Sequence, residues 1–169
     1  MISSRVEIRS EVVSSPASSL RAKKHSLGPC MLNSALARSE DFMNLRIAVA
    51  DDNADILNKL ISVLETEFDV VATATDGKSA LESIRSCCPD VVVLDLEMPL
   101  LNGIEVAREL SKHSPRPAVV ICSLESDPEF IEVARKAGAL GYVFKARIAT
   151  DLIAAVNAVA RGQSFVSHA

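Results

Sequence analysis

Hydrophobic residues recur in short continuous runs from residue 45 onward, and a longer amphipathic segment follows each run. A short apolar run of this kind is typical of a strand that is buried on both faces of a parallel sheet. The sequence therefore predicts five strands, which lie at residues 47–50, 70–72, 91–94, 118–121 and 142–144.

The segments that follow the strands have the periodicity of helices. Residues 54–66 place four apolar side chains at positions i, i+3, i+4 and i+7, on one helical face (Leu57, Leu60, Ile61 and Leu64). Further helices are predicted at 77–86, 103–113, 127–137 and 149–161, several of them after Asp, Asn or Gly. Five strands that alternate with five helices predict an α/β fold with a doubly wound parallel sheet.

Residues 1–43 lack this periodicity and are predicted to form a disordered, Ser-rich N-terminal extension, with the ordered domain at 44–166. Ten serines and two prolines fall within residues 1–42, without a sustained apolar period. A signal peptide would need a continuous apolar core, which is missing. The Arg and Ser enrichment resembles an organellar transit peptide, although Glu7 and Glu11 count against one. A translation start at Met43 is a further alternative.

Composition narrows the classes of function. The formal net charge is −4, and because residues 1–42 carry six basic and four acidic residues (+2), residues 43–169 carry −6. An acidic ordered part without tryptophan argues against direct binding of nucleic acid by this chain. No apolar run is long enough for a membrane span, and no CxxC pair suggests zinc. We expect a cytoplasmic protein.

Polar residues follow four of the five predicted strands. Asp51 and Asp52 follow the first strand, Asp95 the third, Ser123 the fourth and Lys145 the fifth. Each has an ordinary explanation by itself, as a helix cap, a turn residue, a loop residue or a surface charge. All strands of a parallel sheet end on the same edge, however, so these side chains are predicted to converge there.

The predicted cluster has the chemistry of a phosphorylation site. Three neighbouring carboxylates repel one another unless they bind a proton or a cation, and an oxygen-lined site of this kind suits Mg²⁺. Lys145 offers a point charge to a phosphoryl oxygen, and Ser123 offers a hydroxyl donor. A carboxylate is itself able to act as the nucleophile and form an aspartyl phosphate.

At these residues the sequence resembles the CheY-like receiver domain of two-component response regulators. The resemblance covers residues 44–166 and depends on four segments in the order of the family, "IAVADDN", "VVVLDLEMPLLNG", "VVICS" and "GALGYVFKA". It implies a flavodoxin-like fold with strand order 2-1-3-4-5. The segment "DLIAAVNAVARGQSFVS" resembles receivers that precede a LuxR-type helix-turn-helix domain. The sequence ends at Ala169, two residues after this segment, so we expect a stand-alone receiver or one whose output domain is lost or on another chain.

The resemblance also implies roles for individual residues. Asp95 corresponds to the phosphoacceptor, and Mg²⁺ would be held by Asp51, Asp52, Asp95 and the main-chain carbonyl of Glu97. Ser123 corresponds to the switch hydroxyl, Lys145 to the lysine of the family, and Tyr142 to its rotating aromatic residue, with a half-buried strand tyrosine as the alternative. Gly103 corresponds to the glycine that opens the third helix.

The sequence departs from the family at three positions near the site. Ala146 follows Lys145 where the family commonly has proline, so a cis Lys–Pro bond is impossible. Leu124 follows Ser123 where small residues are frequent, which suggests restricted access to the phosphoryl group and slow dephosphorylation. Glu97 adds a negative charge beside Asp95.

The sequence is therefore interpreted as a phospho-receiver that is not an enzyme beyond its own phosphorylation and dephosphorylation. The expected partners are a sensor histidine kinase or a His-containing phosphotransfer protein, and an output partner or homodimer through helix 4, strand 5 and helix 5. Helix 149–161 is apolar around much of its surface, which suggests a partner-facing patch, although packing on the sheet explains Leu152, Val156 and Val159 equally well.

Two alternatives remain at this point. An Mg²⁺-dependent phosphatase with an aspartyl nucleophile would need an Asp-x-Asp motif on its first strand, whereas Asp95-Leu96-Glu97 lies on the third. A phosphorylation-independent adaptor of the same fold would not need the acidic cluster together with Ser123 and Lys145.

Overall fold

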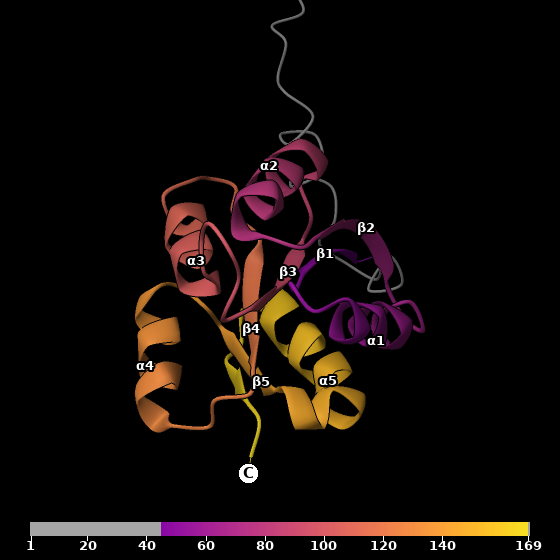
Figure 1. The fold of residues 1–169 in the computed structure, drawn as a ribbon, viewed down its shortest axis with the longest axis vertical. Helices are drawn as coiled ribbons and strands as arrows, with labels where there is room; N and C mark the ends of the chain where they lie inside the picture. The colour runs from indigo at the N-terminus through magenta and orange to yellow at the C-terminus, as the bar shows by residue number, and fades with distance from the viewer. Residues whose placement is uncertain (1–44, 169) are drawn as a thin grey trace, which may run out of the picture.

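The computed structural model describes residues 45–168, so the predicted extension at 1–43 lies outside the described residues. Its centre is a parallel sheet of six strands in the order β2-β1-β3-β4-β5-β6 (Figure 1). The strands are β1 (Arg46–Ala50), β2 (Asp69–Ala74), β3 (Val91–Asp95), β4 (Ala118–Ser123), β5 (Gly141–Phe144) and β6 (Phe165–Val166). The predicted order 2-1-3-4-5 of the first five strands is confirmed.

Five α-helices connect these strands: α1 (Ala54–Leu64), α2 (Gly77–Cys87), α3 (Gly103–Ser111), α4 (Pro128–Lys136) and α5 (Ile148–Ala160). A short 3-10 helix, η3 (Lys145–Arg147), lies between β5 and α5. The first four α-helices each begin after a side chain that accepts hydrogen bonds from the first turn, namely Asn53, Asp76, Asn102 and Asp127. Within residues 45–168, no helix is both long and apolar enough to cross a membrane.

The prediction of five strands is wrong in number, because β6 adds a sixth at the edge of β5. Its two residues are too few to show any periodicity in the sequence. The open edge of β5 supplies the partners instead, since Phe165 N donates to Leu140 O and Ser167 N donates to Tyr142 O, both at 2.9 Å. Because β6 is parallel to β5, the two strands run toward the same edge of the sheet.

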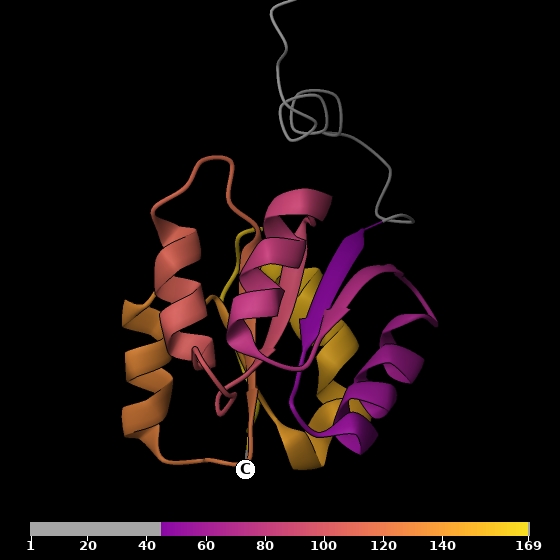
Figure 2. The same cartoon turned by 45° about the horizontal axis from the view of Figure 1, so that its top comes forward.

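Helices cover both faces of the sheet (Figure 2), and their side chains pack on it in two hydrophobic cores. One core joins the sheet to α2, α3 and α4, and the other joins it to α1 and α5. Strand β3 lies between them: Val92 and Leu94 belong to the first core, and Val91 and Val93 to the second. This burial on both sides explains why the sequence of β3 is continuously apolar up to Asp95.

The apolar surface of α5 belongs to the core. Leu152, Ala155, Val156 and Val159 are all buried against α1 and the sheet, and Ile153 is partly buried. These side chains therefore close the second core, as the alternative of packing on the sheet expects, and they do not form an exposed apolar patch by themselves. Larger apolar side chains are exposed on α4 and beside the β5–β6 edge, at Phe130, Val133, Leu140 and Val166.

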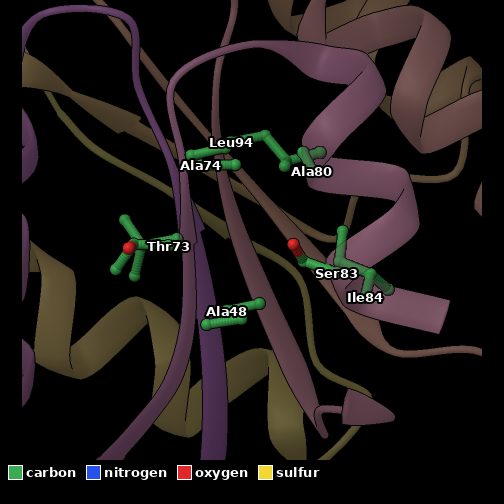
Figure 3. Close-up of a pocket in the computed structure, with 10 residues that line it drawn as sticks. Ala48, Thr73, Ala74, Ala80, Ser83, Ile84 and Leu94 are labelled. Carbon is green, nitrogen blue, oxygen red and sulfur yellow. The ribbon is translucent and has the colours of Figure 1, made fainter. Parts of the chain in front are cut away.

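A small hollow, too narrow to hold a water molecule, lies between α2 and the sheet (Figure 3). The small side chains of Ala48 and Ala74 on the strands face α2 and leave this space, while Thr73 points to the other side of β2. Its lining contains no charged residue, so the hollow does not form part of the predicted acidic cluster.

Leu152 and Ile153 are neighbours on α5, but Leu152 is fully buried and Ile153 only partly, so substitutions at the two positions should have unequal effects. Leu152→Ala should lower the free energy of unfolding by about 2–5 kcal/mol, because it leaves a cavity in the core. Ile153→Ala, as the matched control, should lower it by less than half as much. Urea denaturation followed by circular dichroism measures both values, and equal losses would contradict the placement of α5.

Candidate functional site

The carboxyl ends of four strands bring the predicted site residues together. Asp51 follows β1, Asp95 and Ser123 are the last residues of β3 and β4, and Lys145 follows β5. Their exposed fractions are 0%, 4%, 3% and 8%, respectively. Four polar side chains with so little exposure need partners, because a charge that is removed from water without a counter-charge is costly.

Lys145 supplies the counter-charge to two of the carboxylates. Its Nζ lies 2.8 Å from Asp51 Oδ2 and 2.9 Å from Asp95 Oδ1. Asp51 Oδ1 accepts a hydrogen bond from Asn53 N at 2.9 Å. Asp51 Oδ2 is buried, and its one polar partner among the described residues is Lys145. The lysine therefore holds the ends of β1, β3 and β5 together.

Asn53 removes the alternative in which an aspartate caps α1. The Asn53 side chain accepts hydrogen bonds from Asp55 N and Ile56 N, at 3.0 Å and 3.1 Å. The carboxylates of Asp51 and Asp52 are therefore not needed at the start of the helix. Asp51 is turned inward, whereas Asp52 is exposed.

Three carboxylates form a candidate metal centre at this edge. One oxygen each of Asp51, Asp52 and Asp95 lies within 4.8 Å of the others. Three carboxylates and the single ammonium of Lys145 leave two negative charges, which is the charge that a divalent cation neutralises. An all-oxygen donor set with one exposed member fits Mg²⁺, which retains water ligands.

Burial and ion pairing shift the pKa values of the two central groups. Burial raises the pKa of Asp95, and the charge of Asp51 acts in the same direction, against the hydrogen bond from Lys145. Burial tends to lower the pKa of Lys145, but its hydrogen bonds with Asp51 and Asp95 outweigh this effect and raise the pKa. Lys145 is therefore charged, while the ionised form of Asp95 is held at a cost.

Ser123 and Tyr142 meet at the loop between β4 and α4. Ser123 Oγ accepts a hydrogen bond from Glu125 N at 3.0 Å, and Tyr142 Oη donates to Glu125 O at 2.9 Å. The Tyr142 ring is buried and packs edge-on against Phe144, with ring centroids 5.9 Å apart. Tyr142 is therefore not a half-buried strand residue.

Glu125 could not be identified from the sequence, because it contributes main-chain atoms rather than its side chain. A second close contact involves Gly103, where a Cβ would lie 2.1 Å from Asp95 O. The main chain of β3 and the start of α3 therefore touch directly beneath Asp95. Glu97 lies in the loop between them, with an exposed side chain.

Most of the described residues match a known protein family. Residues 47–157 match the family model of the response regulator receiver domain. The chain belongs to this family. It is thus a receiver domain of the two-component signalling type, which is the family that the sequence resembles.

The relatives include transcriptional regulatory proteins and a chemotaxis protein. The transcriptional regulatory protein DegU of Brevibacillus brevis is 36% identical over 124 residues, which are 72% of this chain and 52% of DegU. The match thus spans about half the length of that relative. The chemotaxis protein CheY of Thermotoga maritima is 29% identical over 120 residues, which are 70% of this chain and all of CheY.

Solved structures show the same fold. The signal receiver domain of NarL from Mycobacterium tuberculosis superimposes with a TM-score of 0.68 at 30% identity, and the match covers 71% of this chain and 98% of that one. A LuxR-family response regulator from Aurantimonas gives a TM-score of 0.69 at 30% identity, with 72% and 89% covered.

The acidic cluster predicts opposite effects of Asp95→Asn with and without Mg²⁺. Because folding raises the pKa of Asp95, ionisation at pH 7 destabilises the folded state, and the neutral amide removes that penalty. In EDTA the variant should melt about 2–5 °C above the wild type. In millimolar Mg²⁺ the wild type should gain more than the variant, because the variant has lost a ligand.

Scanning calorimetry measures these melting temperatures, with Asp69→Asn on the exposed start of β2 as the control. The control should respond to Mg²⁺ as the wild type does. An equal Mg²⁺ response in Asp95→Asn would contradict a metal centre that includes Asp95.

Proposed function

We propose that the chain is the phospho-accepting receiver of a two-component phosphorelay, with Asp95 as the acceptor. The observation that carries this proposal is the double ion pair of Lys145 with Asp51 and Asp95, at the strand edge where Asp52 completes the acidic cluster. The expected donor is a sensor histidine kinase or a His-containing phosphotransfer protein in the cytoplasm.

In the proposed reaction, a carboxylate oxygen of Asp95 attacks the phosphorus of a phosphohistidine. A new O–P bond forms, the P–N bond breaks, and its electron pair stays on the imidazole, which takes up a proton. Mg²⁺, held by Asp51, Asp52, Asp95 and the carbonyl of Glu97, would neutralise charge on the phosphoryl oxygens. Lys145 already lies 2.9 Å from Asp95 Oδ1 and would move its contact to a phosphoryl oxygen.

The proposed switch is the loop between β4 and α4. Phosphoryl oxygens would attract the Ser123 hydroxyl as a donor, and a movement of Oγ toward Asp95 would pull on the hydrogen bond that it accepts from Glu125 N. The buried Tyr142 hydroxyl donates a hydrogen bond to Glu125 O in the same loop. A movement of Ser123 would therefore act on a loop that is also bonded to Tyr142. The surface of α4 and β5, together with α5, is the expected site of an output partner or a second copy.

Acetyl phosphate and Mg²⁺ provide the direct test. Intact mass spectrometry should find one added phosphoryl group on the wild type and none on Asp95→Asn, with Asp69→Asn as the phosphorylated control. No addition to the wild type would support a phosphorylation-independent adaptor. Sustained turnover of free phosphomonoesters would instead support an Mg²⁺-dependent aspartyl phosphatase.

Leu124 predicts a long-lived phosphoryl group. Its side chain directly follows Ser123 and is 79% exposed, so it is free to cover the edge at which water must enter. Leu124→Ala should accelerate the loss of phosphoryl group severalfold after removal of excess acetyl phosphate, as followed by intact mass.

Leu140→Ala is the matched control, because Leu140 is also exposed but precedes β5 at the opposite edge of the sheet. It should leave the lifetime unchanged. If Leu124→Ala decays at the rate of the wild type, Leu124 does not shield the site.

A further inference from the structure

The turn that carries Lys145 lacks the usual local constraints. Ala146 follows Lys145, and no side chain makes a cap hydrogen bond at the start of either η3 or α5. Lys145 nevertheless reaches two carboxylates at 2.8 Å and 2.9 Å with its side chain almost fully buried. Contacts from α5 and β6 therefore contribute to holding its main chain in place.

Asp151, in the first turn of α5, holds the end of this turn. Its carboxylate pairs with Arg147, with Nε at 2.8 Å from Oδ2 and Nη2 at 3.2 Å from Oδ1. It also accepts a hydrogen bond from Thr150 Oγ1 at 2.7 Å. These contacts, the pairing with Arg147 first among them, hold the pKa of Asp151 well below its usual range, so the group is a carboxylate.

Ser167 links the same carboxylate to the residue before Lys145. Ser167 Oγ donates to Asp151 Oδ2 at 2.7 Å and accepts from Phe144 N across a longer distance of 3.4 Å. Ser167 N donates to Tyr142 O at 2.9 Å. Ser167 is 3% exposed, and these partners satisfy its buried hydroxyl.

Asp151 is therefore connected to both sides of Lys145, to Arg147 directly and to Phe144 through Ser167. We propose that Asp151 and Ser167 are positioning residues, which fix the turn so that the Lys145 ammonium reaches Asp51 and Asp95. Strand β6 then belongs to the phosphoacceptor machinery, because it brings Ser167 to β5. The effect on phosphoryl transfer depends on the proposed function, whereas the effect on Lys145 does not.

The test combines a signal from Lys145 with a rate. The Lys145 side-chain methylene resonance is observed by ¹H–¹³C NMR in ¹³C-lysine-labelled full chain and is assigned with Lys145→Arg. The rate is that of phosphoryl incorporation from acetyl phosphate with Mg²⁺. The variants are Ser167→Ala and Asp151→Asn. They are compared with Ser167→Thr, which has a hydroxyl where Ser167→Ala has none.

Two exposed residues supply matched controls. Ser86→Ala removes a hydroxyl that bonds only within α2, and Asp69→Asn neutralises a carboxylate at the start of β2. All spectra and rates are taken at a temperature at which each variant is folded by circular dichroism, so a loss of stability alone leaves both readouts unchanged.

Ser167→Ala and Asp151→Asn should shift the Lys145 resonance and lower the incorporation rate about threefold to tenfold, since small displacements of a catalytic group cost up to about 100-fold. Ser167→Thr and both controls should match the wild type. An unchanged Lys145 resonance in both variants, or a shift that Ser167→Thr does not reverse, overturns the proposal.

If the wild type itself accepts no phosphoryl group, the proposed function fails. The Lys145 resonance then decides the positioning role alone: a shift that Ser167→Thr reverses supports it, and no shift overturns it.

Discussion

Repulsion between buried carboxylates is the constraint on which the rest of this structure depends. Asp51 and Asp95 are almost fully buried at neighbouring strand ends, and the Lys145 ammonium between them makes this tolerable. The balance is incomplete, because Asp52 adds a third carboxylate to the same edge. The remaining negative charge is what suits this edge to a divalent cation.

The fold supplies the rigidity that such an arrangement needs. Strand β3 is packed on both faces, and Gly103 lets α3 touch the main chain of Asp95 directly, so this carboxylate has little freedom. Lys145 enters from a turn with few constraints of its own, which is held through α5 and β6. One partner of the ion pair is thus fixed by the core, and the other by polar contacts at the edge of the sheet.

The sequence was sufficient for the elements whose residues carry a repeated pattern, and for site residues at the ends of those elements. The five long strands, the helices and the convergence of Asp51, Asp95, Ser123 and Lys145 were predictable for this reason. Strand β6 was not, because two residues form no pattern and the strand depends on the free edge of β5. The hydrogen bond at Glu125 was not predictable either, since it uses a main-chain atom and does not depend on the residue type. The apolar surface of α5 was ambiguous, because a core helix and an exposed patch share one composition.

The contact of Tyr142 with Glu125 has a practical consequence for optical spectroscopy. The chain contains one tyrosine and no tryptophan, so all of its tyrosine absorbance and fluorescence come from a single side chain. That side chain is Tyr142, whose hydroxyl donates to Glu125 O in the loop after Ser123. The tyrosine fluorescence of the unlabelled protein therefore reports on the environment of this loop, with no contribution from another tyrosine or from a tryptophan.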